Sequence, residues 1–405
     1  MSPEGWEERY ARQELPALSP VVTGFNINLD RVITLSREML DDSALIDGEL
    51  TELRRRLVAS MEYCTAAEWI VDDRILFRTA TDHFGTTGEI SLGGQAGIAA
   101  LHLARLGVPG VVCLTPAAGR RAAGLLESEG IRVICHARVP DVVHTILEYE
   151  PGLVPLVPGA IPRSNRFIIS PEKSAGSTLL PQGSQDRIIP QLSSCTRAFL
   201  SGYQYLATGE EFTAGADQIA WLRQANPAMR VHVECVSVTD PAVNAGIVDT
   251  ILPAADSAGM NENELSLLLG HRTGPDPAGL VRDMMVLADR TGLSRIHLHT
   301  YGYYLEIRRS GDAIPEKIQD ALLFAAKAAA DHAGGQGARV TREGVAAVSQ
   351  VTAAYGEGSV PGITSSGPYD IIAVPALVAR EIRRTVGLGD VISASALAAT
   401  SWKTG

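Results

Sequence analysis

Residues 386–393, Val-Gly-Leu-Gly-Asp-Val-Ile-Ser, place two glycines and an aspartate where a loop is expected to turn into a helix. Gly387 and Gly389 can adopt backbone conformations closed to other residues, and the unpaired amides of the following helix attract an anion such as phosphate. Asp390 would lie at the rim of that anion site, where a base belongs in phosphoryl transfer. The alternative is an ordinary helix start with an acidic first turn, because short glycine motifs recur by chance.

The composition is typical of a globular protein. The 405 residues are 45% hydrophobic and 20% charged, and no apolar run reaches the length of a membrane span. The formal charge of -11 and the pI near 5.4 argue against a general binder of nucleic acid or of anionic membranes. The polar first 20 residues lack the features of a signal peptide, so a cytoplasmic location is expected. Five cysteines at wide spacings, with no CxxC pair, predict buried thiols rather than disulfides or a zinc site.

Short apolar runs alternate with longer helical patterns along most of the chain, which predicts an α/β fold with a parallel sheet covered by helices. The predicted strands are 21–25, 111–114, 132–135, 198–201, 230–234, 250–252, 295–299 and 370–374. The predicted helices include 97–106, 120–128, 214–224, 262–269, 279–289, 317–330 and 391–401. Of these, only the alanine-rich stretch 321–330 is biased in composition.

Two stretches break the β/α alternation and predict a second, smaller domain. Residues 31–92 are charged and largely helical, and residues 138–182 are rich in proline, glycine and short β segments. Insertions from one edge of an α/β core can pack together over the active-site crevice as a lid. We therefore expect a large domain formed by 1–30, 93–137 and 183–405, and a lid formed by 31–92 and 138–182. A closing lid would exclude water, which phosphoryl transfer requires.

Two polar clusters are candidates for binding a sugar. Asn26, Asn28 and Asp30 follow the first apolar run at a spacing of two, which turns the three side chains to one face. Amides and a carboxylate together suit hydroxyls, which donate and accept hydrogen bonds, although Asn and Asp are also common in turns. Gly93-Gly94-Gln95 precedes an amphipathic helix and would bring backbone amides close to a ligand.

Acidic residues at strand ends are candidates for holding a metal ion. Glu234 ends a predicted strand, and the run 261–264, Asn-Glu-Asn-Glu, opens a helix soon after another. Mg²⁺ is held through one or two carboxylates and water while it binds phosphate oxygens, which would reconcile these acids with a phosphate site. Glu264, one turn into the helix, is the better candidate for a metal ligand, because an acid at the position of Glu262 is typical of helix capping.

His297 and His299 lie two apart on a predicted strand. No Cys or carboxylate stands at ligand spacing beside them, which favours a structural or hydrogen-bonding role over metal binding.

Taken in order, eight segments resemble the ADP-dependent glucokinase and phosphofructokinase family, a branch of the ribokinase-like sugar kinases. They are GFNINLD (24–30), SLGGQAGIAA (91–100), NRFI (165–168), SGYQYL (201–206), HVE (232–234), GMNENEL (259–265), HTYGYYL (299–305) and TVGLGDVIS (385–393). The resemblance implies a ribokinase-like three-layer α/β sandwich with a mainly parallel sheet and a smaller α+β lid. The chain is somewhat shorter than expected of the family, mostly around the lid and before the last motif.

The resemblance also implies roles for individual residues. Asp390 would be the catalytic base that takes the proton of the sugar hydroxyl, and Gly387, Leu388 and Gly389 would form the anion hole. Glu264 would organise Mg²⁺ with support from Glu234, and Asp390 would lie beside the same ion. The sugar would be held by Asn28, Asp30, Gly93, Gly94 and Gln95. The phosphoryl donor, ADP, is implied by the resemblance alone.

The identity of the sugar depends on the lid. Glu68 lies at about the position where the glucose-using branch carries a glutamate for a sugar hydroxyl, which favours glucose. Arg163, Arg166 and Lys173, in the second lid segment, could instead meet the phosphate of fructose 6-phosphate, although each is more easily explained as lid surface. Fructose 6-phosphate, both sugars, or another sugar therefore stay open.

Two further alternatives are an ATP-dependent sugar or nucleoside kinase of the same superfamily and a sugar or nucleotide sensor without turnover. The first is motivated by the GxGD motif, which both branches share. The second is disfavoured because a sensor has no need of Asp390, Glu264 and Gly389. The oligomeric state cannot be read from the sequence.

Overall fold

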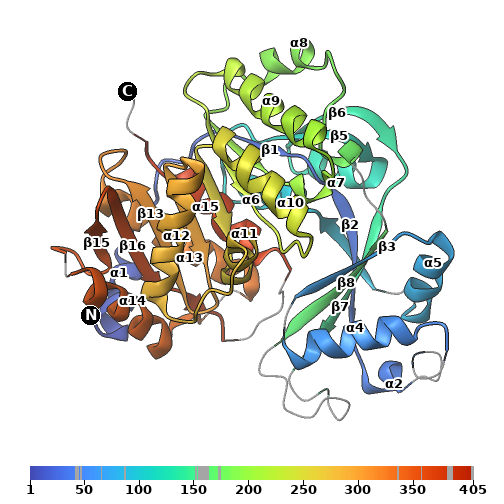
Figure 1. Cartoon of the computed structure of the whole chain (residues 1–405), viewed down its shortest axis with the longest axis horizontal. Helices are drawn as coiled ribbons and strands as arrows, with labels where there is room; N and C mark the ends of the chain where they lie inside the picture. The colour runs from blue at the N-terminus through green and yellow to red at the C-terminus, as the bar shows by residue number, and fades with distance from the viewer. Residues whose placement is uncertain are drawn as a thin grey trace.

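The chain forms two sheets of unequal size, with their helices (Figure 1). In this computed structural model the described residues are 1–41, 45, 48–64, 66–85, 88–150, 153, 164–171, 175–334, 337–356, 358–380 and 386–402. The predicted lid cations Arg163 and Lys173 lie outside them. No helix among the described residues is long and apolar enough to cross a membrane.

The larger sheet has ten strands and is mainly parallel. In spatial order they are β15 (Ile363–Ser366), β16 (Tyr369–Pro375), β13 (Tyr303–Arg309), β12 (Arg295–His299), β11 (Ser257–Met260), β10 (Arg230–Glu234), β9 (Arg197–Leu200), β1 (Val21–Gly24), β5 (Val112–Gly119) and β6 (Arg132–Val139). The strands from β12 to β6 run parallel, whereas β13, β16 and β15 add an antiparallel edge. The carboxyl ends of the parallel strands therefore meet along one edge.

Helices cover both faces of this sheet, which makes three layers. One face carries α6 (Gln95–Arg105), α7 (Arg120–Ser128), α13 (Pro315–Ala333) and α15 (Leu388–Ala399). The other carries α9 (Gly209–Ala225), α10 (Pro241–Gly246), α11 (Glu262–Leu269), α12 (Pro277–Thr291) and α14 (Arg342–Tyr355). Because both faces are covered, β1 and β9 are buried at every residue, as the continuous apolar runs predict.

The remaining elements are short or peripheral. They are α1 (Pro3–Ala11), which packs on α13, α8 (Gln185–Ile188), the 3-10 turns η1 (Ala175–Ser177), η2 (Ile189–Leu192) and η3 (Tyr203–Tyr205), and the two-stranded pair β14 (Arg339–Val340) and β17 (Leu377–Val378).

The smaller sheet is mixed and carries its own apolar core. Its order is β3 (Ala67–Val71), β8 (Asn165–Pro171), β7 (Val143–Tyr149), β2 (Asn28–Thr34) and β4 (Glu89–Gly93). Trp69, Phe167 and Leu147 on one face pack with α4 (Thr51–Glu62), α5 (Arg74–His83) and α2 (Arg37–Leu40), which lie together at the outer side of this sheet in Figure 1. This face is covered, so the opposite face of the sheet is free to line a cavity.

The structure confirms the α/β class, with a mainly parallel large sheet and a smaller mixed one. The assignment of residue ranges to two domains stays a prediction. The chain passes from β1 to β2 through residues 25–27 and returns from β4 to α6 through Gly94.

The strand predicted at 250–252 is wrong. These residues belong to a π-helical turn, η4 (Ile247–Ile251), and a 3-10 turn, η5 (Leu252–Ala254), that continue α10. Ile247, Val248, Ile251 and Leu252 are all buried, and the spacing i, i+1, i+4, i+5 is that of a helix face. The true strand, β11, consists of small residues and Met260, without the β-branched residues that mark most strands.

Candidate active site

The glycines before and within the first turn of α15 are required by their surroundings. Gly387 is the N-cap and has a left-handed backbone with φ of 77°. A Cβ on Gly387 would lie 2.7 Å from Cγ2 of Ile98, and one on Gly389 would lie 2.7 Å from Nε2 of His299. Gly389 and Asp390 are already helical, so the predicted helix begins three residues earlier than expected. The amides of this first turn have no partner within the helix, which is the geometry of an anion site.

Asp390 faces the same region and is electrostatically perturbed. Burial raises the pKa of its carboxyl to about 7, a shift that the guanidinium of Arg166 and a hydrogen bond from Gln95 oppose. Arg166 comes from β8 of the smaller sheet, and Asp390 is the largest of the charges that favour its protonated form. The two sheets thus contribute opposite charges to one place.

Glu264 and Glu234 stand at the carboxyl ends of neighbouring strands. Glu264 caps its own helix, because its Oε2 accepts from the backbone N of Asn261 at 2.8 Å while Oδ1 of Asn261 accepts from the N of Glu264 at 3.0 Å. Burial and the nearby charge of Asp390 raise the pKa of Glu264 to about 8, against these hydrogen bonds. The pKa of Glu234 is raised well above its usual value by burial, Asp390 and Glu264. The charge of Asp390 therefore reaches two buried carboxyl groups at this edge of the sheet.

Asn28 and Asp30 form a buried polar pair at the start of β2. Nδ2 of Asn28 donates to Oδ1 of Asp30 at 2.7 Å, and Nδ1 of His144 lies 3.9 Å from the same oxygen. Gly93 pairs with Asn28 across β2 and β4, and a Cβ on it would lie 2.2 Å from Oδ1 of Asp30. Gly94 has a φ of 76° and would collide with the backbone O of Asn26 if it carried a Cβ. Both glycines are therefore needed to seat this pair.

Glu68 lies on the open face of the smaller sheet. It pairs with Ile168 across β3 and β8, and its Oε1 accepts from the hydroxyl of Ser170 at 2.6 Å. The strand register places Asp30, His144 and Arg166 on this same face. A row of polar and charged groups thus faces away from the core of the smaller sheet.

These groups meet in one cavity of about 800 Å³ between the two sheets. Of the residues predicted for the site, those that line it are Asn28, Asp30, Glu68, Gly94, Gln95, Glu234, Glu264, Gly387, Leu388, Gly389 and Asp390. Gly93 does not line it and acts by leaving room for Asp30. His299 lines it, whereas His297 is fully buried behind it.

The sequence did not reveal the apolar wall of the cavity, which comes from α13 and β17. It consists of Ala329, Ala330, Ala333, Leu377, Val378 and Ala379. The one sequence feature that pointed to this wall was the alanine bias of 321–330, which is equally typical of a helix that packs closely against its neighbours. Such a wall of small apolar side chains suits a flat apolar group of a ligand.

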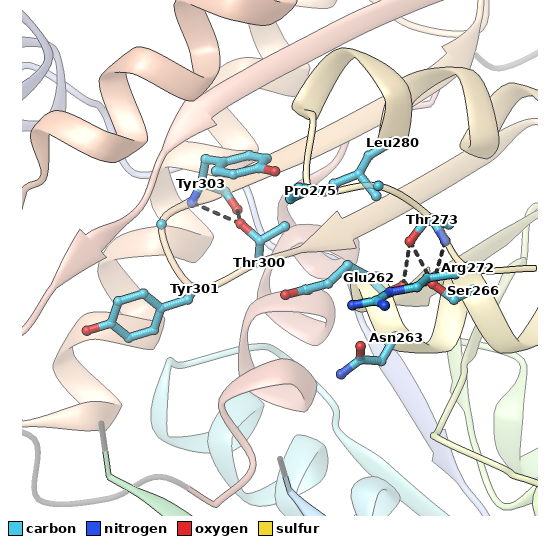
Figure 2. Close-up of a pocket in the computed structure, with 12 residues that line it drawn as sticks. Glu262, Asn263, Ser266, Arg272, Thr273, Pro275, Leu280, Thr300, Tyr301 and Tyr303 are labelled. Carbon is cyan, nitrogen blue, oxygen red and sulfur yellow. Dashed lines mark hydrogen bonds between the residues drawn. The ribbon is translucent and has the colours of Figure 1, made fainter. Parts of the chain in front are cut away.

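A second cavity, of about 380 Å³, adjoins the first and is lined in part by the turn that joins β12 to β13. Figure 2 shows the side chain of Thr300 holding this turn, where its Oγ1 accepts from N of Tyr303 at 3.2 Å, opposite Glu262 and Arg272. Glu262 lines both cavities.

The acidic side chains that line the cavity could hold a metal ion together with water and phosphate oxygens. Among the described residues, no three His, Cys, Asp or Glu side chains are grouped closely enough to hold an ion by themselves. Mg²⁺ does not need such a group, since one or two carboxylates with water and phosphate oxygens suffice. Glu264 and Glu234 fit this mode, because a divalent cation would favour the ionised form that burial opposes.

The molecule combines a mainly parallel α/β sandwich with a cavity under a second sheet, which the start of α15 and buried acids line. This combination is typical of a kinase of small molecules. Residues 19–399 match the family described as the ADP-specific Phosphofructokinase/Glucokinase conserved region. The chain belongs to this family and is an ADP-dependent sugar kinase, as the resemblance implies.

Known relatives fall on both sides of the family. The chain is 28% identical to an ADP-dependent glucose/glucosamine kinase of Pyrococcus furiosus, over 96% of this chain and 97% of that protein. It is 26% identical to an ADP-specific phosphofructokinase of Methanosarcina acetivorans, over 98% of each. An ADP-dependent kinase solved with fructose-6-phosphate and ADPbetaS shares the fold, with a TM-score of 0.85 at 23% identity and 98% coverage of both chains.

Proposed function

We propose that this kinase transfers the β-phosphoryl group of Mg-ADP to a hydroxyl of a hexose, giving AMP and a hexose phosphate, with glucose as the preferred acceptor. The observation that carries the proposal is the convergence of Asp390, the loop at Gly387 and the Asn28–Asp30 pair in one cavity. The sugar hydroxyl, the base and the transferred phosphoryl group can then lie within reach of one another.

Asp390 takes the proton of the attacking hydroxyl as the new bond to phosphorus forms and the bond to the AMP oxygen breaks. The free amides at the start of α15 and the guanidinium of Arg166 stabilise the negative charge of the phosphoryl group. Asn28 and Asp30 orient the sugar through their amide and carboxylate. Glu264, supported by Glu234, would hold Mg²⁺, which supplies positive charge to the phosphate oxygens. The apolar wall on α13 and β17 would take the adenine ring.

The charge of the sugar-facing surface supports an uncharged acceptor. On the open face of the smaller sheet, the cavity is lined by the carboxylates of Asp30 and Glu68 and by the guanidinium of Arg166. The positive charge of Arg166 is already opposed by Asp390, Glu148 and Asp30, which favour its protonated form. An acidic surface repels fructose 6-phosphate and accepts the hydroxyls of glucose.

Fructose 6-phosphate is the second candidate acceptor, supported by the similarity to the Methanosarcina acetivorans phosphofructokinase and by the fructose-6-phosphate in the related kinase structure. The test is a panel of glucose, glucosamine and fructose 6-phosphate, each with ADP or ATP and Mg²⁺, with AMP and ADP resolved by chromatography. Glucose-dependent formation of AMP from ADP is expected. AMP formation with fructose 6-phosphate alone would reverse the acceptor, and turnover of ATP alone would overturn the donor.

A further inference from the structure

A row of buried polar side chains crosses the larger sheet beneath α15. The register places His232 of β10 beside Ser257 of β11, Ser257 beside Arg295 of β12, and Arg295 beside Arg308 of β13. Each of these four side chains is at most 1% exposed. The row begins at His232, two residues before Glu234, which lines the cavity, and it ends at Arg308 on β13.

The two nitrogens of His232 have partners of different kinds. Nδ1 lies 2.9 Å from the hydroxyl of Ser257 and 3.5 Å from Nη1 of Arg295. Nε2 lies 3.1 Å from Oε2 of Glu234. A guanidinium only donates hydrogen bonds, so the approach of Arg295 favours the tautomer in which Nδ1 accepts and Nε2 carries the proton. In that tautomer His232 donates to Glu234.

Arg295 is held in place from its other side. Its Nη2 lies 2.8 Å from Oε2 of Glu306, and Oε1 of Glu306 lies 3.3 Å from Nε of Arg308. Gly259 leaves the space in which the pair formed by His232 and Glu234 lies, since a Cβ there would be 2.1 Å from Oε2 of Glu234. The planar fork of Arg295 can thus contact Glu306 and His232 at the same time.

We propose that Arg295 is a positioning residue for the metal ion: it fixes the tautomer of His232, whose Nε2 proton orients the carboxylate of Glu234 toward the cavity. The inference rests on the proposed magnesium site. Outer partners of this kind set the direction and basicity of the groups nearer the ion, and their loss commonly weakens metal binding about 10- to 100-fold.

The test compares two arginines that share a partner. Arg295→Lys and Arg308→Lys each keep a positive charge beside Glu306, but only Arg295 contacts His232. A lysine ammonium cannot reproduce the two-sided contact. Binding of Mn²⁺ in the presence of ADP is measured by the electron paramagnetic resonance signal of the free ion. We expect Arg295→Lys to weaken Mn²⁺ binding about tenfold or more, and Arg308→Lys to leave it within about twofold.

A second pair of variants tests the tautomer without touching the ion pair. His232→Gln retains a side-chain amide donor for Glu234 and should keep most of the Mn²⁺ affinity, whereas His232→Leu should lose it. Since glutamine has no tautomers, Arg295→Lys should add little to His232→Gln in a double-mutant cycle. The comparison of His232→Gln with His232→Leu does not require Arg295→Lys to fold, and equal Mn²⁺ affinities of these two variants would overturn the role of the Nε2 proton.

Equal Mn²⁺ affinities of the wild type and Arg295→Lys, equal losses in both arginine variants, or additive effects in the cycle would overturn the role of Arg295. Failure of the wild type to bind Mn²⁺ with ADP would instead overturn the proposed metal site itself. The two failures are therefore distinguishable.

Discussion

The two edges of the larger sheet bury opposite charges in different ways. At the carboxyl edge, Glu234, Glu264 and Asp390 face a cavity, and the charge of Asp390 adds to burial in raising the pKa values of both glutamates. At the amino edge, Arg295 and Arg308 share Glu306, and the ring of Trp402 lies 4.1 Å from the guanidinium of Arg308. Each amino-edge guanidinium has the carboxylate of Glu306 as a partner within the protein, whereas the carboxyl-edge acids act unfavourably on one another.

The difference separates charge that serves the fold from charge that serves a ligand. A buried charge without an internal partner opposes folding, so its presence at a cavity indicates that a bound group completes it. A charge with an internal partner contributes to stability only as long as the partner remains. Variants at the two edges should therefore separate stability from activity.

The largest effect is expected from removing the counter-charge of the amino edge. Glu306→Ala leaves Arg295 and Arg308 buried without their carboxylate, which should cost about 3–5 kcal/mol in the free energy of unfolding measured in urea. Asp249→Ala is the control, because its ion pair with Arg290 is exposed and should cost less than about 1 kcal/mol. Equal losses of unfolding free energy in the two variants would contradict a stabilising role of Glu306.

The next effect concerns the carboxyl edge. Asp390→Asn should lower the rate of AMP formation from ADP and glucose at least about a hundredfold, the scale of positioned proton transfer. The midpoint of thermal unfolding should not fall, because burial already disfavours the carboxylate of Asp390. Turnover at the wild-type rate would remove Asp390 from the mechanism.

Substitutions at two glycines test whether the loop at Gly387 binds the phosphates of ADP. Gly387→Ala and Gly107→Ala both introduce a side chain at positive φ, at 77° and 80°, for roughly 1–2 kcal/mol each. Only the first would also press on Ile98, because a Cβ at Gly107 meets no atom within 4 Å. Kinetic assays should show a raised KM for ADP in Gly387→Ala alone. A similar change in Gly107→Ala would indicate a general effect of backbone strain.

The smallest effect is expected at Trp402. Trp402→Ala removes a ring that stacks on Arg308 and lies 5.3 Å from the guanidinium of Arg230, which should cost about 1 kcal/mol in urea unfolding. Trp402→Phe, which retains an aromatic ring, should lose less. Steady-state kinetics should match the wild type, and a loss of turnover without a loss of stability would contradict a structural role.

Much of the site could be predicted because its residues lie at strand ends and helix starts. Glu234 follows an apolar run, and Asn261 and Glu264 match a capping box, so local pattern and position in the sheet agree. The strand before Asn261 was predicted at 250–252 and is wrong, because the apolar residues that form one face of a short helical turn resemble a short strand in sequence. The sequence did not show that Gly93 leaves room for Asp30, and its contact with the sugar stays a prediction.

The sequence by itself determined the α/β class, the family and the helix start after Gly387, because local periodicity, positive-φ glycines and helix starts depend on neighbours along the chain. Only the tertiary structure brought Arg166 to Asp390, formed the apolar wall on α13 and compensated Arg295 with Glu306. These contacts join residues from different elements, and their energies depend on burial and distance, which arise only when the two sheets and their helices have packed.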